Sequence, residues 1–128
     1  MRRVVPLAVA LALVASACVG ATAARHERLV IGFIFVGSHD DLGYNQAAWE
    51  GSEALARAFP DAEVRRVENV PEDAHAVAAL EDLVDQGATI LFATSFGHLA
   101  AAYEVARRHP EVTVLHQGGV EPTPHLPN

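Results

Sequence analysis

Apolar residues in this chain fall into two alternating patterns, short unbroken runs and longer stretches with helical spacing. The short runs are rich in β-branched residues and predict strands at residues 29–36, 62–67, 89–93 and 112–116. In the longer stretches apolar residues recur every three or four positions, which predicts helices at residues 44–59, 73–86 and 98–108.

This alternation, with connections of only a few residues, predicts an α/β fold with a doubly wound parallel sheet in the order βαβαβαβ. The run at 29–36 is apolar throughout, as expected of a central strand buried on both faces, whereas the run at 62–67 is more polar and is expected nearer an edge. The inner face of the first helix is predicted to comprise Tyr44, Ala47, Ala48, Gly51, Leu55 and Ala58.

Two adjacent acids, Asp40 and Asp41, follow the first predicted strand. In open α/β sheets ligands bind in the crevice outside the carboxyl ends of the strands, so this turn is the first candidate for a site. Aspartate is also a preferred helix cap, and one of the two carboxylates is expected to cap the first helix. Capping requires only one acid. The second is therefore a candidate for contact with a ligand.

Aromatic and amide side chains accompany these acids. Tyr44, Asn45 and Trp49 lie at the start of the first helix, and Phe96 stands between two small residues after the third strand. Aromatic faces beside carboxylate and amide groups suit a flat heterocycle, which needs stacking area and edge-directed hydrogen bonds. The alternative is that Tyr44 and Trp49 are core or interface aromatics and that Phe96 packs under its loop.

Histidines follow three of the predicted strands, at His39, His98 and His116. With the two aspartates they offer a metal site as an alternative, although their spacing matches no tight ligand motif, and we expect no metal. Ser95 does not lie in a G-x-S-x-G elbow, and no glycine-rich phosphate-binding motif occurs. The sequence therefore predicts no catalytic residue and no bound cofactor.

Residues 1–23 have the layout of a secretory signal peptide, with a basic start, an apolar run at 4–14 and small residues after it. Ala15-Ser16-Ala17 before Cys18 resembles a lipobox, and residues 21–23 offer an ordinary A-x-A cleavage site instead. Cys18 is the only cysteine and has no disulfide partner in the chain, which favours a lipidated protein. We expect an exported protein in the periplasm or on the outer face of the cell membrane.

Residues 24–28 read as a linker, 29–119 as the domain and 120–128, with three prolines, as a tail leading to a second lobe of a longer protein. A four-stranded parallel sheet of about 90 residues keeps an edge open, which supports that reading. The net charge is −7, and the nine arginines form no long run. Nucleic-acid binding depends on clustered positive charge and is not expected.

Several segments together resemble the basic membrane protein (BMP) family of ABC-transporter substrate-binding lipoproteins, which includes purine nucleoside receptors. The resembling segments are IGFIFVG, DDLGYNQAAWEG, RRVENVPED, ILFATSFGH and VTVLHQGG. The resemblance implies the first lobe of a two-lobed, hinge-closing periplasmic binding protein that holds a nucleoside or nucleobase between its lobes. It also implies polar contacts from Asp41 and Asn45 and stacking or wall contacts from Tyr44 and Phe96, with Asp40 as a weaker match.

The predicted function is a non-catalytic, monomeric solute-binding component of an ABC importer. It would capture a small solute, a purine nucleoside or nucleobase, and deliver it to a membrane permease. One alternative is a ligand-sensing module of the same fold in a signalling system. The other is a small metal-dependent enzyme that uses His39, His98, His116 and the two aspartates.

Overall fold

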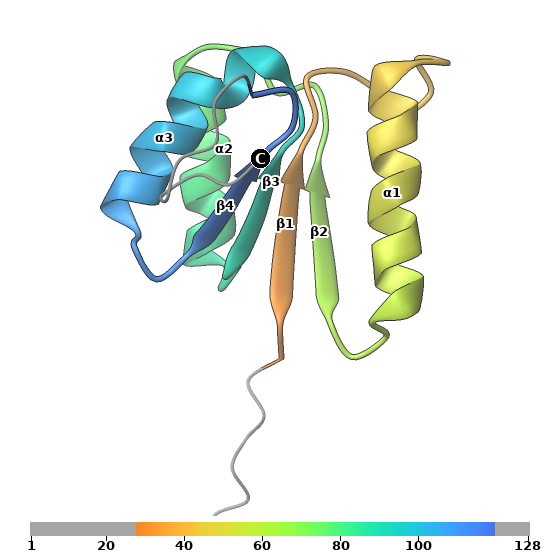
Figure 1. The fold of residues 1–128 in the computed structure, drawn as a ribbon, viewed down its shortest axis with the longest axis horizontal. Helices are drawn as coiled ribbons and strands as arrows, with labels where there is room; N and C mark the ends of the chain where they lie inside the picture. The colour runs from red at the N-terminus through yellow and green to blue at the C-terminus, as the bar shows by residue number, and fades with distance from the viewer. Residues whose placement is uncertain (1–27, 120–128) are drawn as a thin grey trace, which may run out of the picture.

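The computed structural model describes residues 28–119, where strands and helices alternate as the sequence predicts (Figure 1). The strands are β1 (Val30–Ile34), β2 (Glu63–Val67), β3 (Ile90–Ala93) and β4 (Thr113–His116). The helices are α1 (Tyr44–Ala58), α2 (Ala74–Asp85) and α3 (Leu99–Arg108). A 3₁₀ turn, η1 (Phe96–His98), precedes α3, so the third helix begins one residue later than predicted.

The four strands form one parallel sheet in the order β2-β1-β3-β4, which confirms the predicted doubly wound α/β fold. β1 pairs with β2 on one side and β3 on the other, and all five of its residues are buried. Helix α1 covers one face of the sheet, and α2 and α3 cover the other (Figure 1). β2 is an edge strand of intermediate burial, as its polar sequence predicts.

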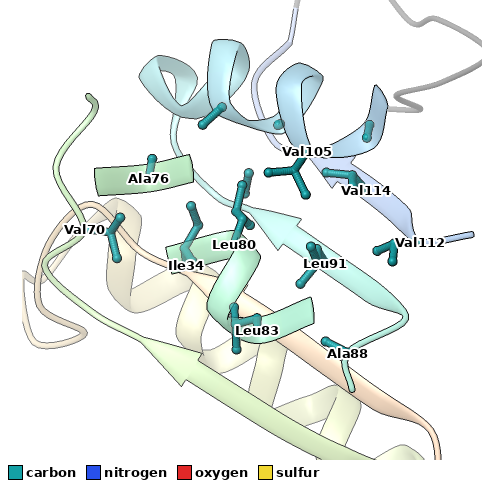
Figure 2. Packing of buried hydrophobic residues seen from close by; sticks show 14 of the residues in the cluster. Ile34, Val70, Ala76, Leu80, Leu83, Ala88, Leu91, Val105, Val112 and Val114 are labelled. Atoms are coloured by element: carbon teal, nitrogen blue, oxygen red, sulfur yellow. The ribbon is translucent and has the colours of Figure 1, made fainter. Parts of the chain in front are cut away.

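The larger hydrophobic core lies between the sheet and helices α2 and α3 (Figure 2). Leu80 of α2 and Val105 of α3 are fully buried against Leu91 of β3. Gly32 of β1 lies under this layer, and a Cβ there would be 2.8 Å from the Leu91 side chain and 2.9 Å from that of Leu83. The helix layer can approach the central strand this closely only because residue 32 has no side chain.

Gly87 closes helix α2 as the residue after its C-cap, as predicted, and its φ of 92° is left-handed. The Gly87 N–H donates to the Val84 carbonyl at 2.8 Å, and the Ala88 N–H donates to the Leu83 carbonyl at 2.9 Å. These two bonds form a Schellman motif, which satisfies carbonyls that would lack partners at the helix end. Ala88 is itself buried, so the motif also turns the chain back into the core.

The predicted inner face of α1 is wrong. Tyr44, Ala47, Gly51 and Ala58 of that set are exposed, and the face against the sheet comprises Asn45, Ala48, Trp49, Ser52 and Leu55. Trp49 explains the difference, because its ring packs at 5.5 Å from the Phe35 ring and carries far more apolar area than the alanines and glycine do. Ser52 can be buried because its hydroxyl donates to the Trp49 carbonyl at 2.6 Å.

The predicted signal peptide (1–23), Cys18, most of the linker and the tail (120–128) lie outside the described residues. Within residues 28–119, none of the helices is both long enough and apolar enough to cross a bilayer. The sheet and its helices span residues 30–116, within the predicted lobe at 29–119, and the predicted boundaries of that lobe stay a prediction.

We predict that Leu80→Ala lowers the free energy of unfolding by about 2–5 kcal/mol, because it removes a fully buried side chain and leaves a cavity between α2, α3 and the sheet. Urea denaturation followed by circular dichroism measures this loss. Leu42→Ala is the matched control, since Leu42 is 91% exposed and its removal is expected to change stability little. Equal losses in the two variants would contradict the observed core.

Candidate functional site

Two exposed aromatic residues meet beyond the carboxyl ends of the strands. Tyr44, at the start of α1, is 47% exposed, and Phe96, in the turn after β3, is 62% exposed. A Cβ placed on Gly118, beyond β4, would lie 3.7 Å from Tyr44 Oη and 3.9 Å from Phe96 Cβ. Segments far apart in the sequence therefore come close together beyond the carboxyl ends of the strands. Gly118 itself has a φ of 92°, a conformation that favours glycine.

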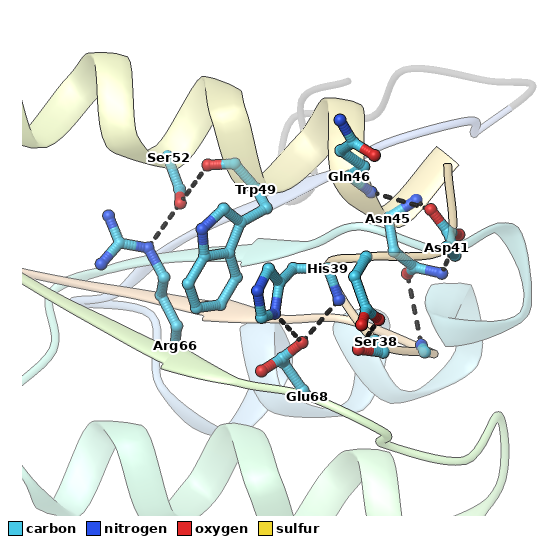
Figure 3. Close-up of polar contacts among 11 residues, drawn as sticks. Ser38, His39, Asp41, Asn45, Gln46, Trp49, Ser52, Arg66 and Glu68 are labelled. Carbon is cyan, nitrogen blue, oxygen red and sulfur yellow. Dashed lines mark hydrogen bonds and ion pairs between the residues drawn. The ribbon is translucent and has the colours of Figure 1, made fainter. Parts of the chain in front are cut away.

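The side chain of Asp41 caps the start of α1, although Gly43, two residues later, occupies the N-cap position (Figure 3). Asp41 Oδ1 accepts the backbone N–H groups of Gly43 at 2.8 Å and Gln46 at 3.1 Å. Its Oδ2 accepts the backbone N–H of Asn45 at 3.1 Å and the side-chain amide of the same residue at 2.8 Å. These bonds stabilise the ionised carboxylate, led by that from Gln46, and lower the pKa of Asp41 to about 2.

Asn45 extends this arrangement into the protein. Its Oδ1 accepts the backbone N–H of Gly37 at 3.2 Å, while its Nδ2 donates to Asp41, and the residue is only 7% exposed. A Cβ on Gly37 would lie 2.8 Å from that Nδ2, so this close approach requires glycine. Asn45 therefore connects the end of the first strand segment to the start of α1. Among residues 28–119, Nδ2 donates only to Asp41, although an amide nitrogen carries two hydrogens.

The predicted ligand residues thus fall into two groups. Tyr44 and Phe96 present side-chain surface at the rim, whereas Asp41 and Asn45 bond chiefly to the loop and the helix. Asp40 is exposed and accepts the hydroxyl of Ser38, which is the main reason why the pKa of Asp40 is lowered. Both acids are exposed, but they differ in their partners, because Asp41 bonds to the start of α1 and Asp40 bonds to Ser38.

Trp49 is a packing residue at this end of α1 (Figure 3). The His39 ring stacks on it at 4.6 Å, and the Arg66 guanidinium lies 5.0 Å from its ring centroid. Glu68 then accepts both the backbone N–H of His39, at 2.6 Å, and its ring Nδ1–H, at 2.8 Å. The hydrogen bond to Glu68 raises the pKa of His39, because it favours the protonated ring.

Sequence reasoning missed Glu68, Ser52 and Arg66 as partners in this network. Arg66 Nε donates to the Ser52 hydroxyl at 2.6 Å, across the gap between β2 and α1. The sequence could have indicated Ser52 as a partner, because Trp49 and Ser52 are three residues apart and lie on the same side of one helix. Glu68 offered none, because the contact with His39 joins residues 29 positions apart.

His98 and His116 are buried beneath the rim, at 0% and 2% exposure. His98 Nε2 lies 3.0 Å from the Val70 carbonyl, and His116 Nε2 lies 2.8 Å from the Ser95 carbonyl, so both rings donate from Nε2. Burial lowers the pKa of His98. In each ring Nδ1 is buried and has no partner among the described residues.

The histidines of the metal-dependent alternative, and Ser95, have other partners in the structure. The rings of His98 and His116 donate to backbone carbonyls, His39 pairs with Glu68, and within residues 28–119 no three metal-ligating side chains gather. The Ser95 hydroxyl donates to the carboxylate of Glu72 and not to a histidine. A serine whose proton is directed at a carboxylate in this way lacks the histidine base of a nucleophilic site.

A separate hollow of about 680 Å³ lies at the opposite end of the sheet, lined by Leu29, Phe59 and Pro60 among others. It faces the amino end of β1 and the end of α1, away from Tyr44 and Phe96. This hollow therefore does not include the exposed aromatic residues of the rim. A ligand at the rim would need cover from a second surface to be enclosed.

We predict that Asp41→Asn lowers the melting temperature at pH 7, because the amide replaces a carboxylate that accepts four hydrogen bonds. The folded pKa of Asp41 is depressed from 3.8 to about 2, so its stabilisation is present above pH 4 and is lost as the pH falls toward 2. Melting curves between pH 7 and pH 2 should therefore show the difference from wild type shrinking in acid. Asp82→Asn, on the exposed side of α2, is the control, and a difference independent of pH would contradict the capping role.

We predict opposite titration shifts for two histidines in an NMR titration of the ring protons. The His39 midpoint should lie above 6.5 because of Glu68, and the His98 midpoint below 6.5 because of burial. The stability that His39 contributes is therefore present below pH 6.5 and is lost as the pH rises through the folded pKa of His39. The stability that His98 contributes is present above pH 6.5 and is lost as the pH falls through the folded pKa of His98. The His39 shift should disappear in Glu68→Gln, and its survival there would show another cause.

Comparison with known proteins shows the family and the fold. Residues 28–123 match the family model of the PnrA-like ABC-transporter substrate-binding proteins (Bmp). A purine-binding protein of Brucella abortus (strain 2308) is 32% identical over 110 residues, which cover 85% of this chain and 31% of that protein. The chain thus spans about a third of the length of this relative.

Solved structures share the fold at lower identity. An ABC-transporter solute-binding protein of Conexibacter woesei matches with a TM-score of 0.64 and 18% identity, over 72% of this chain and 30% of its own. A transcriptional activator of the comK gene from Bacillus halodurans matches with a TM-score of 0.64 and 21% identity, over 76% and 32%. With the family match over residues 28–123, the chain belongs to the PnrA-like ABC-transporter substrate-binding proteins.

Proposed function

We propose that this chain forms one ligand-binding lobe of a non-catalytic ABC-importer component that captures a purine nucleoside or nucleobase and delivers it to a membrane permease. The observation that carries the proposal is the pair of exposed aromatic residues, Tyr44 and Phe96, at Gly118 on the carboxyl edge of the sheet. Ligands of open α/β folds bind at this edge. A purine ring offers two flat faces for such aromatic side chains.

The polar groups of the rim suit the edges of the same ligand. Asn45 has a second Nδ2 hydrogen that can donate to a ring nitrogen or carbonyl, and its position is held by Asp41. The exposed Asp40 carboxylate can accept hydrogen bonds from amino or hydroxyl groups. Asp41 contributes through Asn45, and directly where a ligand donor reaches its carboxylate. The proposed site therefore comprises Asp40, Asp41, Tyr44, Asn45 and Phe96.

The relative from Brucella abortus is named a purine-binding protein, which supports the choice of purines as the first ligands to test. The chain spans 31% of that relative, so the complete binding protein would enclose the ligand between this lobe and a second one. We propose further that the protein acts as a monomer, is exported, and is anchored through a lipid on Cys18. Export and lipid anchoring match the signal layout of residues 1–23.

A ligand-sensing role in a signalling system is the second candidate. The Bacillus halodurans protein of the same fold is named a transcriptional activator, so this architecture occurs outside transport components. The two candidates share the same rim and ligand chemistry. They differ in the partner protein, which is a permease in transport and a signalling protein in sensing. Co-purification of the protein with a permease would support the transport role.

We predict that adenosine, guanosine, inosine or adenine shifts the NMR signals of Tyr44, Phe96 and Gly118 in the described lobe, because a stacked purine adds a ring current to each. Affinity is expected in the weak range of about 1 mM, since one lobe leaves half of the ligand surface in water. Heteronuclear correlation spectra recorded during a nucleoside titration measure both the position and the affinity.

Phe96→Ala should abolish these shifts, and Phe59→Ala is the matched control because Phe59 is equally exposed, at 57%, but lies at the other end of the sheet. Ribose and uridine serve as ligand controls for the sugar and for a smaller base. Absence of any shift at the three rim residues with every purine would refute the purine assignment. Equal shifts with ribose would refute recognition through the base.

A further inference from the structure

Phe96 is held in its turn from both sides by one carboxylate. Glu72 lies in the loop between β2 and α2, and its Oε1 accepts the hydroxyl of Ser95 and the backbone N–H of Gly97, the latter at 3.1 Å. Ser95 and Gly97 are the immediate neighbours of Phe96. The residue that presents the most exposed ring of the rim is therefore flanked by two bonds to the same oxygen.

Gly97 lies directly against the carboxylate of Glu72. A Cβ on Gly97 would lie 2.6 Å from each carboxylate oxygen of Glu72, closer than real contacts allow. The described glycines with left-handed φ are Gly87 and Gly118, so the backbone of Gly97 does not itself require glycine. The Glu72 carboxylate occupies the space that a side chain at position 97 would need.

Further bonds fix the same turn from below. The Nε2–H of His116, at the end of β4, donates to the carbonyl of Ser95 at 2.8 Å. The Nε2–H of His98 donates to the carbonyl of Val70 at 3.0 Å, in the loop that also carries Glu72. Hydrogen bonds thus join the loop before α2, the turn after β3 and the end of β4 around Phe96. Phe96 itself is 62% exposed.

We propose that Glu72 is a positioning residue that presets Phe96 as a rigid stacking platform before ligand arrives. The role in ligand binding rests on the function proposed above, whereas the effect on the conformation of the turn does not. Presetting a side chain in its bound position removes an ordering cost from binding. The hydrogen bond from Ser95 and then that from Gly97 lower the pKa of Glu72, which keeps it a charged acceptor at neutral pH.

NMR of the ligand-free chain tests the proposal with two substitutions. Glu72→Ala removes both acceptor bonds, so amide exchange at Gly97 should speed up by about tenfold and the NOE between Phe96 and Gly118 should be lost. Glu72→Gln keeps an oxygen at the Oε1 position and should restore most of the NOE. Contacts between Leu80 and Leu91 in the core should persist in both variants and show that the fold is intact. An unchanged Phe96–Gly118 NOE in Glu72→Ala would overturn the proposal.

A double-mutant cycle gives an independent readout. Gly97→Ala should displace the carboxylate and lose the Phe96–Gly118 NOE in the wild-type background. In the Glu72→Ala background the same substitution meets no carboxylate, so it should change the spectrum and the melting temperature much less. Additive effects in the cycle would mean that Gly97 is required for another reason and would count against the proposal.

Ligand binding separates this proposal from the wider one. If purines bind, Glu72→Ala should weaken the binding several-fold and Glu72→Gln should weaken it less, while Glu53→Gln on the outer side of α1 should have no effect. Equal purine affinity of wild type and Glu72→Ala would overturn the presetting role. If no purine binds to any variant, the purine assignment fails, and the NOE and exchange results still decide whether Glu72 positions Phe96.

Discussion

The structure depends on the complete burial of β1 between two layers. The backbone groups of β1 pair with β2 and β3 within the sheet, and its apolar side chains point to both faces. Helix α1 covers one face, and α2 and α3 cover the other. Gly32 lets Leu83 and Leu91 approach that strand closely. Because all four strands run parallel, this packing also places every connection that follows a strand at one edge of the sheet.

That edge is organised by hydrogen bonds that leave aromatic rings free. Asp41 and Asn45 satisfy the backbone at the start of α1, and Glu72 does the same for the turn after β3. Asp41, Asn45 and Glu72 thus bond mainly to the loops and the start of α1, whereas Tyr44 and Phe96 keep exposed surface. The polar groups of the rim therefore have hydrogen-bond partners within the protein when no ligand is bound. The aromatic rings still offer flat apolar faces to a ligand.

Much of the fold could be predicted because its signals are local. The apolar runs and their spacing predicted each strand and helix to within about two residues, and Gly87 marked the end of α2 through its own conformational freedom. The inner face of α1 was predicted wrongly because alanine and glycine count as apolar in a pattern yet bury little area. The Trp49 contacts with Phe35, His39 and Arg66 decided the rotation of the helix, and none of these is visible as a local pattern.

The candidate site shows the same division. The sequence by itself determined that acids, an amide and aromatics follow buried strands. It also determined that they lie beyond the same ends of the strands, because the alternation of strands and helices with short connections implies a parallel sheet. Only the tertiary structure decided which of those side chains face inward. Asp41 accepts hydrogen bonds from four donors at the start of α1. Glu72 bonds to the residues on either side of Phe96, which follow it by 23 and 25 positions in the chain. Such orientations depend on partners that the fold brings together, and spacing along the chain carries no information about them.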